Sequence, residues 1–99
     1  MSFKKYRWSK DYEAAEEELE LLLTTLGQDL SRWEAAAYAD LEPRRLANAR
    51  QIWCAEGSLR LTIGGQSVSL QPGDAITIAP GQLHSGTAGV AGCVCYEAM

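Results

Sequence analysis

The sequence predicts an all-β barrel or sandwich preceded by a single α-helix, and three observations support this. Near the N-terminus, apolar side chains recur every three or four residues, which is the pattern of a helix with one buried face. Apolar and polar side chains alternate between Leu59 and Ile63, and again beyond the tight turn Gly64-Gly65. Turn-forming residues then recur about every 8–12 positions, as they do in all-β domains.

The predicted helix begins at a cap supplied by Ser9 or Asp11 and ends before Gly27. Its apolar stripe comprises Tyr12, Ala15, Leu19, Leu22, Leu23 and Leu26, while glutamates occupy the other side. The stripe could dock on a partner, but we expect it to pack against the chain's own barrel. Residues 1–30 are therefore predicted to form an N-terminal helical extension, and residues 31–99 the barrel domain.

Several short strands are expected after the helix. The stretch that contains Trp33 and Tyr38 could form a strand or a short helix, and we favour a strand. Glu42-Pro43 is expected to break whatever precedes it, because proline disfavours helix in the residue before it. Asp74 is expected to accept backbone N–H groups within its own turn. The remaining strands are predicted at 51–54, 59–63, 68–70, 75–78, around 84 and at 93–97.

Composition limits the classes of function. A formal net charge of −4 argues against nucleic acid, because phosphate binding needs clustered lysine and arginine. No run approaches the roughly 20 apolar residues that cross a membrane, and no secretory signal is expected. The three cysteines lack metal-finger spacing and are interpreted as reduced thiols of a cytoplasmic protein. A chain of 99 residues is marginally stable alone, so a homodimer is expected.

Residues 73–84 carry a family resemblance. A Gly-Asp turn opens a strand, a Pro-Gly turn follows, and His84 comes three residues after Gly81. This run resembles the second conserved motif of the cupins, and residues 56–65 resemble the segment that links their two motifs. The resemblance covers roughly residues 33–97. Arg32-Trp33 and the ending from Gly92 to Glu97 are similar to small single-domain cupins. It implies a cupin jelly-roll β-barrel with an N-terminal α-helix packed outside.

The same resemblance raises the question of a metal. Cupin enzymes hold a divalent metal through His-x-His and a glutamate of the first motif, together with the histidine of the second. Counted back from Gly57, the first three positions fall at Arg44, Leu46 and Arg50. Leucine has no donor atom and arginine offers no lone pair. His84 is the sole histidine of the chain, so the metal motif is interpreted as degenerate and no cofactor is expected.

Two kinds of site remain open. A metal could be held by His84 with Cys54 and Cys95, assisted by Glu56 or Glu97, a set that would favour zinc or copper. Without a metal, the candidate ligand-binding residues are His84, Arg50, Arg44 and Trp53. Paired arginines suit a small polar or anionic ligand, the histidine can carry a proton, and the tryptophan offers a flat aromatic face. Each also has a purely structural interpretation, in the core or at the barrel rim.

Two functional hypotheses follow. The first is a non-catalytic binding or scaffolding module with no catalytic residue, dimeric through its barrel edges or its front helix. The alternative is a small-molecule enzyme of the cupin type, either metal-independent or using the unusual His/Cys metal site. The sequence contains no phosphate loop, Ser-His-Asp set or helix-turn-helix pattern, so neither hypothesis includes reading of nucleic acid.

Overall fold

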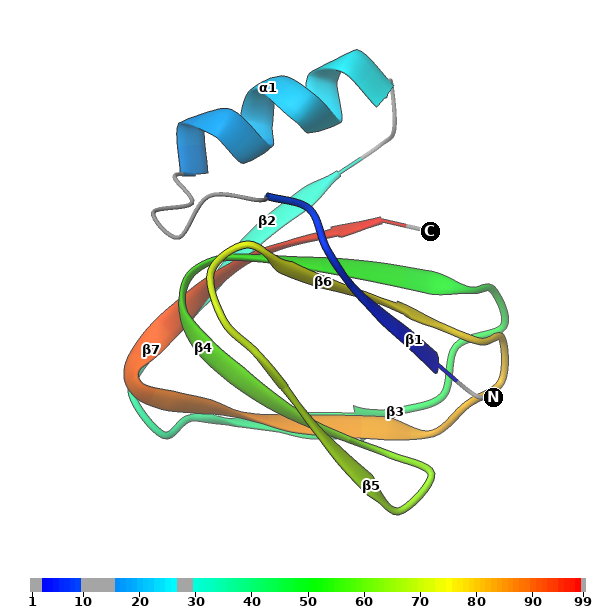
Figure 1. The fold of residues 1–99 in the computed structure, drawn as a ribbon. Coiled ribbons are helices and arrows are strands. Elements are labelled where there is room, and N and C mark those ends of the chain that lie inside the picture. Colours follow the sequence, from blue (N-terminus) through cyan, green and yellow to red (C-terminus); the bar gives the residue numbers. More distant parts are fainter. Residues whose placement is uncertain (1–2, 10–15, 27–29, 99) are drawn as a thin grey trace.

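The computed structural model describes residues 3–9, 16–26 and 30–98, and within them the chain forms one helix and seven strands (Figure 1). Every strand pairing is antiparallel. The predicted all-β fold with one N-terminal helix is confirmed. The elements are β1 Phe3–Arg7, α1 Glu16–Leu26, β2 Ser31–Ala35, β3 Asp40–Arg44, β4 Arg50–Ile63, β5 Gln66–Leu70, β6 Asp74–Ile78 and β7 His84–Ala98.

Two long strands, β4 and β7, run through both layers of the barrel. In the first layer the strands lie in the order β1-β6-β4-β7-β2. Further along each strand, β4 pairs with β5 and β7 pairs with β3, which makes the second layer. The sequence predicted four separate short strands here, at 51–54, 59–63, around 84 and at 93–97. The pairing of β4 with β7 continues through the bends, with register shifts between Cys54 and Glu56 and between Gly57 and Leu59.

The bend of β4 depends on a glycine. Gly57 has φ +70°, and a Cβ placed there would lie 2.0 Å from the carbonyl oxygen of Gly92 on β7. A side chain at position 57 would therefore meet both backbone strain and a collision with the neighbouring strand. Glycine at this position allows the two long strands to bend together without losing their pairing.

The apolar side chains form two separate cores. One fills the barrel between the layers and includes Ile52, Cys54, Leu59, Leu61, Ile63, Ile76 and Ile78. The other lies between the first layer and the helix and includes Leu19, Leu23, Trp53 and Tyr96. Because side chains alternate along a strand, β4 supplies Ile52 and Cys54 to the first core and Trp53 to the second.

The helix packs on the outside of the barrel, as predicted. Leu19 and Leu23 are fully buried against the first layer, whereas Leu22 is 38% exposed, so the buried stripe is narrower than expected. Tyr12, Ala15 and the predicted caps at Asp11 and Gly27 lie outside the described residues. The hydroxyl of Tyr96 on β7 contacts the carboxylates of Glu16 and Glu20, which ties the helix to the sheet.

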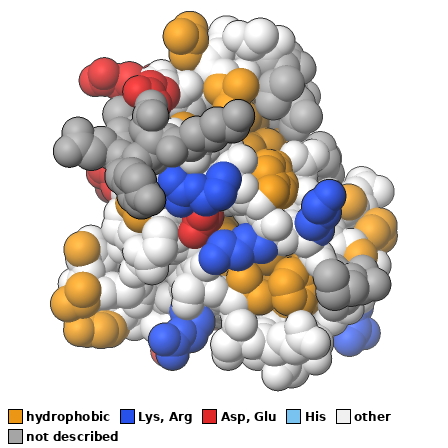
Figure 2. Space-filling model, viewed as in Figure 1, with side chains coloured by type: hydrophobic (Ala, Val, Ile, Leu, Met, Phe, Trp, Pro, Cys, Tyr) orange, Lys and Arg blue, Asp and Glu red, His pale blue; other side chains and the backbone are white. Residues whose placement is uncertain are grey.

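The N-terminal strand β1 was not predicted. It pairs with β6 through five residues, from Phe3 opposite Ile78 to Arg7 opposite Asp74. Asp74 is buried and accepts the N–H of Gln71, as predicted, and it also binds the side chain of Arg7 at 2.8 Å. Figure 2 shows basic side chains gathered on the face that carries β1. Phe3–Arg7 therefore belongs to the barrel sheet and not to a helical extension. Among the described residues, no helix is long and apolar enough to cross a membrane.

Candidate functional site

The mouth of the barrel gathers charged side chains at the end where β4 begins and β7 finishes. Arg50 is the first residue of β4, and it lies on the same face as Ile52, which points into the barrel core. Glu97, near the end of β7, is in register with Ile52, two residues beyond the buried Cys95. The alternation of both strands therefore turns Arg50 and Glu97 inward at this mouth.

Two arginines converge on the carboxylate of Glu97. Arg44 places Nη2 3.0 Å from Oε1 and Nη1 3.3 Å from Oε2, a two-pronged contact. Arg50 places Nη1 3.2 Å from Oε2. The Glu97 side chain is 7% exposed, that of Arg50 19% and that of Arg44 41%. Since two guanidinium groups share one carboxylate, this trio carries one positive charge in excess.

His84 lies beside this trio and is itself held at both ring nitrogens. It is opposite Arg44 in the β3–β7 register, with Nε2 3.4 Å from Nη2 of Arg44. Its Nδ1 is 3.2 Å from the carbonyl oxygen of Gln82. A guanidinium only donates and a carbonyl only accepts, so the tautomer with its proton on Nδ1 satisfies both contacts. The lone pair that a metal would need is thereby directed at an arginine.

A pocket of about 340 Å³ opens onto these charges between β2, β3 and β7. Arg44, Glu97 and two further carboxylates line its charged part, and Trp33 and Leu41 supply apolar surface. Trp33 is opposite Cys95 in the sheet and packs against the barrel core. The remaining lining residues are Asp40, Glu42 and Pro43. A pocket with apolar walls and a few converging charged groups is the usual form of a small-molecule site.

One donor at the mouth has no partner. Nε of Arg50 is buried and makes no hydrogen bond with any residue that the structure describes. A buried guanidinium N–H without an acceptor is costly, because it has left water and gained nothing in exchange. This unpartnered donor favours an additional acceptor at the mouth, whereas Asp40 and Glu42 in the pocket lining offset the positive charge of the trio.

The structure brings three of the four predicted ligand-binding residues together. Arg44, Arg50 and His84 meet around Glu97, as described above. Trp53 does not join them: it is 2% exposed and belongs to the core beneath the helix, because it lies on the opposite face of β4 from Arg50. Trp33 is the tryptophan that lines the pocket. Ligand binding by the three residues at the mouth stays a prediction.

The alternative His/Cys metal set does not come together in the structure. Cys54 and Cys95 face each other across β4 and β7, deeper in the barrel than Glu97. Contacts with the Cys54 and Cys93 thiols, together with burial, raise the pKa of Cys95, which keeps it a thiol and not a metal-binding thiolate. Among residues 3–9, 16–26 and 30–98, no three His, Cys, Asp or Glu side chains are placed to hold a metal ion.

The residues at the cupin metal positions do not fit a divalent metal either. Arg44 and Arg50 bring positive charge and no lone pair to the place where two ligands would be needed. Within the described part of the chain, Glu97 is the one carboxylate that contacts them, and both arginines bind it. From the sequence, Glu97 is expected only as a possible metal ligand. Its inward orientation follows from alternation with Cys93 and Cys95, but its pairing with the arginines depends on strand registers that no sequence motif reports.

Comparisons with known proteins agree with this fold. The sequence pattern of the AraC-like ligand binding domain family matches residues 51–98. A cupin superfamily protein from Desulfitobacterium hafniense is similar in structure, with a TM-score of 0.66 and 9% identity over 98% of this chain and 76% of that one. The chain is a small domain with the cupin fold. No curated protein matches this small cupin in sequence.

Two further solved structures resemble this small cupin. A DUF861 family protein from Thermotoga maritima has a TM-score of 0.63 and 12% identity, with 98% of each chain covered. A protein of unknown function from Rhizobium leguminosarum bv. viciae has a TM-score of 0.63 and 18% identity over 69% of this chain. The small cupin spans 64% of the Rhizobium chain, less than two thirds of its length. At these identities the likeness shows the fold alone.

Proposed function

We propose that this small cupin is a non-catalytic binding module that holds a small molecule through a carboxylate or similar anionic group at the barrel mouth. The observation that carries the proposal is the convergence of Arg44 and Arg50 on one carboxylate beside an open pocket. Charge-assisted, two-pronged contacts of this kind are the ones by which arginine recognises carboxylate and phosphate.

The chain's own Glu97 supports the choice of ligand chemistry. Its carboxylate occupies the space between the two guanidinium groups, so the spacing of these groups suits a carboxylate. The Nε of Arg50, which has no partner among the described residues, leaves capacity for a second acceptor. In this arrangement the ligand's anionic group binds beside Glu97, and its apolar part lies against Trp33 and Leu41. We propose that the degenerate metal motif was replaced by this arginine–carboxylate cluster.

Calorimetric titration with acetate, benzoate, succinate and citrate tests the proposal. We expect at least one of these anions to bind, and the Arg50→Gln variant to bind it about tenfold more weakly. Arg45→Gln is the matched control, because Arg45 is an exposed arginine one residue from Arg44, whereas Arg50 is the arginine that pairs with Glu97. Equal affinity of the Arg50→Gln and Arg45→Gln variants would refute the role of the mouth. Absence of binding by all four anions would refute the anionic ligand.

Two broader parts of the proposal concern the protein in the cell. We propose a homodimer, supported by Leu21 and Leu22, which lie 72% and 38% exposed on the helix. Light scattering should give twice the monomer mass for the wild type and the monomer mass for the Leu21→Glu variant. A monomeric wild type would contradict the dimer.

A cytoplasmic location is supported by the three cysteines, which are all free thiols.

A further inference from the structure

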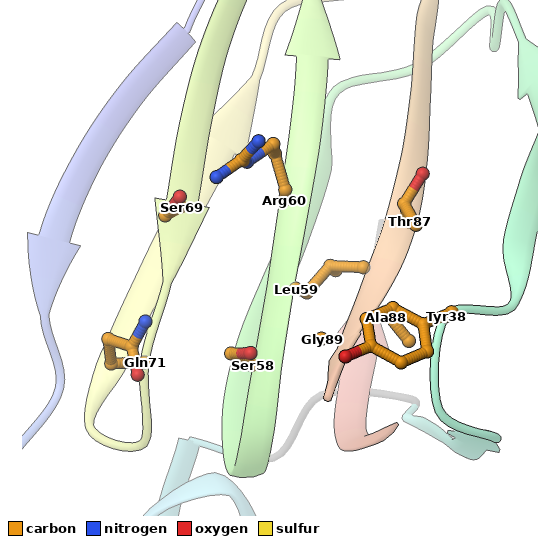
Figure 3. A pocket seen from close by; sticks show the side chains of 9 residues that line it. All are labelled: Tyr38, Ser58, Leu59, Arg60, Ser69, Gln71, Thr87, Ala88 and Gly89. Atoms are coloured by element: carbon orange, nitrogen blue, oxygen red, sulfur yellow. The ribbon is translucent and has the colours of Figure 1, made fainter. Parts of the chain in front are cut away.

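A second hollow lies on the outer surface of the barrel, away from the mouth. It has a volume of about 370 Å³ and runs across β5, β4 and β7, next to the turn between β2 and β3 (Figure 3). Because Leu59 and Leu61 of β4 point into the barrel core, the neighbouring Ser58 and Arg60 point outward into this groove. The groove is therefore separated from the mouth by the strand layer itself.

Polar side chains from three strands line the groove. Ser69 and Gln71 border it on the β5 side and Thr87 on the β7 side, around Ser58 and Arg60 of β4. Figure 3 shows the Arg60 guanidinium extending toward Ser69. Arg60 forms no ion pair with the described residues. Thr87 donates its hydroxyl hydrogen to Asp40, and the hydroxyl oxygen of Thr87 can still accept a hydrogen bond. These groups offer hydrogen bonds in several directions around a single positive charge.

One wall of the groove is an aromatic ring held on a strained backbone. Tyr38 has φ +60°, the only positive φ outside glycine in the described residues, and its side chain is 67% exposed. Its N–H donates to the carbonyl of Gly89, and Ala88 donates to the carbonyl of Ala39, so the turn is fastened to β7. Figure 3 shows the phenol ring beside Gly89, with its hydroxyl toward Ser58.

Neither burial nor backbone preference accounts for a tyrosine here. Glycine or asparagine would adopt this conformation with less strain, and an exposed ring contributes little to the core. Strained residues of this kind cluster where the side chain has a task. Gly89, at the floor of the groove, leaves no room for a side chain. A Cβ there would lie 1.9 Å from Oγ of Ser58, so any other residue would displace the serine and fill the groove.

We propose that this outer groove binds a saccharide ring that carries a carboxylate. Sugar rings combine an apolar C–H face with many hydroxyl groups, which suits an exposed phenol ring beside several hydroxyl and amide side chains. The lone guanidinium of Arg60 matches one anionic substituent. The hydroxyl groups of the ring pair with Ser58, Ser69, Gln71 and Thr87, and its apolar face lies on Tyr38.

Backbone amide NMR spectra recorded with glucuronate, galacturonate, glucose and acetate test this inference. We expect glucuronate or galacturonate to shift the amide signals of Ser58, Arg60 and Gly89. Glucose should shift the same signals at higher concentration, and acetate should leave them unchanged. If neither uronate shifts these signals, the proposal is overturned. Shifts by acetate as strong as those by the uronates would overturn the saccharide assignment, because the site would then recognise only an anion.

Three variants separate the groove from the rest of the molecule. Arg60→Gln should weaken uronate binding about tenfold and bring it to the level of glucose, whereas Arg45→Gln should not. Tyr38→Asn should weaken binding of both sugars severalfold while its urea midpoint stays equal to or above wild type, because asparagine accepts this backbone conformation. If Tyr38 were purely structural, Tyr38→Asn would lower the urea midpoint and leave the binding of both sugars unchanged. Arg50→Gln should leave the groove signals unchanged, which keeps this test independent of the barrel mouth.

Discussion

The carboxylate of Glu97 offers the sharpest test of the barrel mouth, through the Glu97→Gln variant. The substitution keeps the size of the side chain and removes the charge that Arg44 and Arg50 share. Glu97 is 7% exposed and Arg50 19%, so this pair lies largely out of water. Removing one partner of a fully buried pair costs about 3–5 kcal/mol, because the other charge is left uncompensated.

The expected loss is smaller than this, because part of the cluster is solvated. Arg44 is 41% exposed, and water screens its share of the interaction, as at exposed ion pairs worth roughly 0–1 kcal/mol. The amide of glutamine also keeps one oxygen as an acceptor. We therefore expect the free energy of unfolding to fall by about 2–3 kcal/mol, which lowers the melting temperature by roughly 10–20 °C in a domain of this size.

Urea unfolding followed by circular dichroism measures this difference, and an unchanged m-value shows that the unfolded state is unaffected. Glu42→Gln is the matched control, since Glu42 is an exposed glutamate on the rim of the same pocket. It should change the stability by less than about 0.5 kcal/mol. A Glu97→Gln variant as stable as the control would show that Glu97 does not compensate the charge of Arg50.

Three further predictions concern the rest of the fold. Leu23→Ala should destabilise the protein by about 2–4 kcal/mol, because the fully buried Leu23 joins the helix to the sheet, whereas Val90→Ala, at an exposed site, should have almost no effect in the same urea assay. Gly57→Ala should lower the melting temperature far more than Gly65→Ala; both glycines have positive φ, but only a Cβ at position 57 collides with a carbonyl. Hydrogen bonds from Arg32 and, to a smaller extent, from Tyr96 hold the pKa of the Glu16 carboxyl below its ordinary 4.5. The contribution of Glu16 to the free energy of unfolding is therefore present above pH 4.5 and is lost as the pH falls through the lowered pKa. Glu16→Gln should therefore flatten the stability profile in this acidic range; a profile as steep as that of wild type would contradict the contact.

Local patterns in the sequence predicted the second layer well. Strict alternation on both sides of Gly64-Gly65 predicted a hairpin, and the structure pairs Leu59 with Leu70 and Ile63 with Gln66. A two-residue turn and a buried face together leave little freedom of register. The separation of β4 into two strands was wrong because a glycine bend looks like a break in the alternation, although pairing with β7 continues through it.

The unpredicted strand β1 shows where local patterns fail. It has five residues, three of them basic, and no turn signal leads into it. Its partner β6 lies about 70 residues further along the chain, and an edge strand with charged side chains gains its stability from that distant pairing. The pairing, and the contact between Arg7 and Asp74, are properties of the assembled sheet.

The candidate site was predictable in its members but not in its contacts. The family resemblance placed Arg44, Arg50 and His84 at the former metal positions, and all three lie at the barrel mouth. The partnership of Glu97 with both arginines requires β3, β4 and β7 to meet in a particular register. Trp53 could have been excluded from the sequence, because alternation from Arg50 places it on the outer face of the strand.

The most direct test of the barrel mouth is the side-chain Nε–H signal of Arg50 in ¹H–¹⁵N spectra of the wild-type protein, followed during titration with succinate and then with Zn²⁺. We expect succinate to shift this signal as Nε of Arg50 gains an acceptor, and Zn²⁺ to leave the ring signals of His84 unchanged. An Arg50 signal that does not shift with succinate, together with His84 signals that shift with Zn²⁺, would contradict the anion-binding proposal and would indicate a metal site at the barrel mouth.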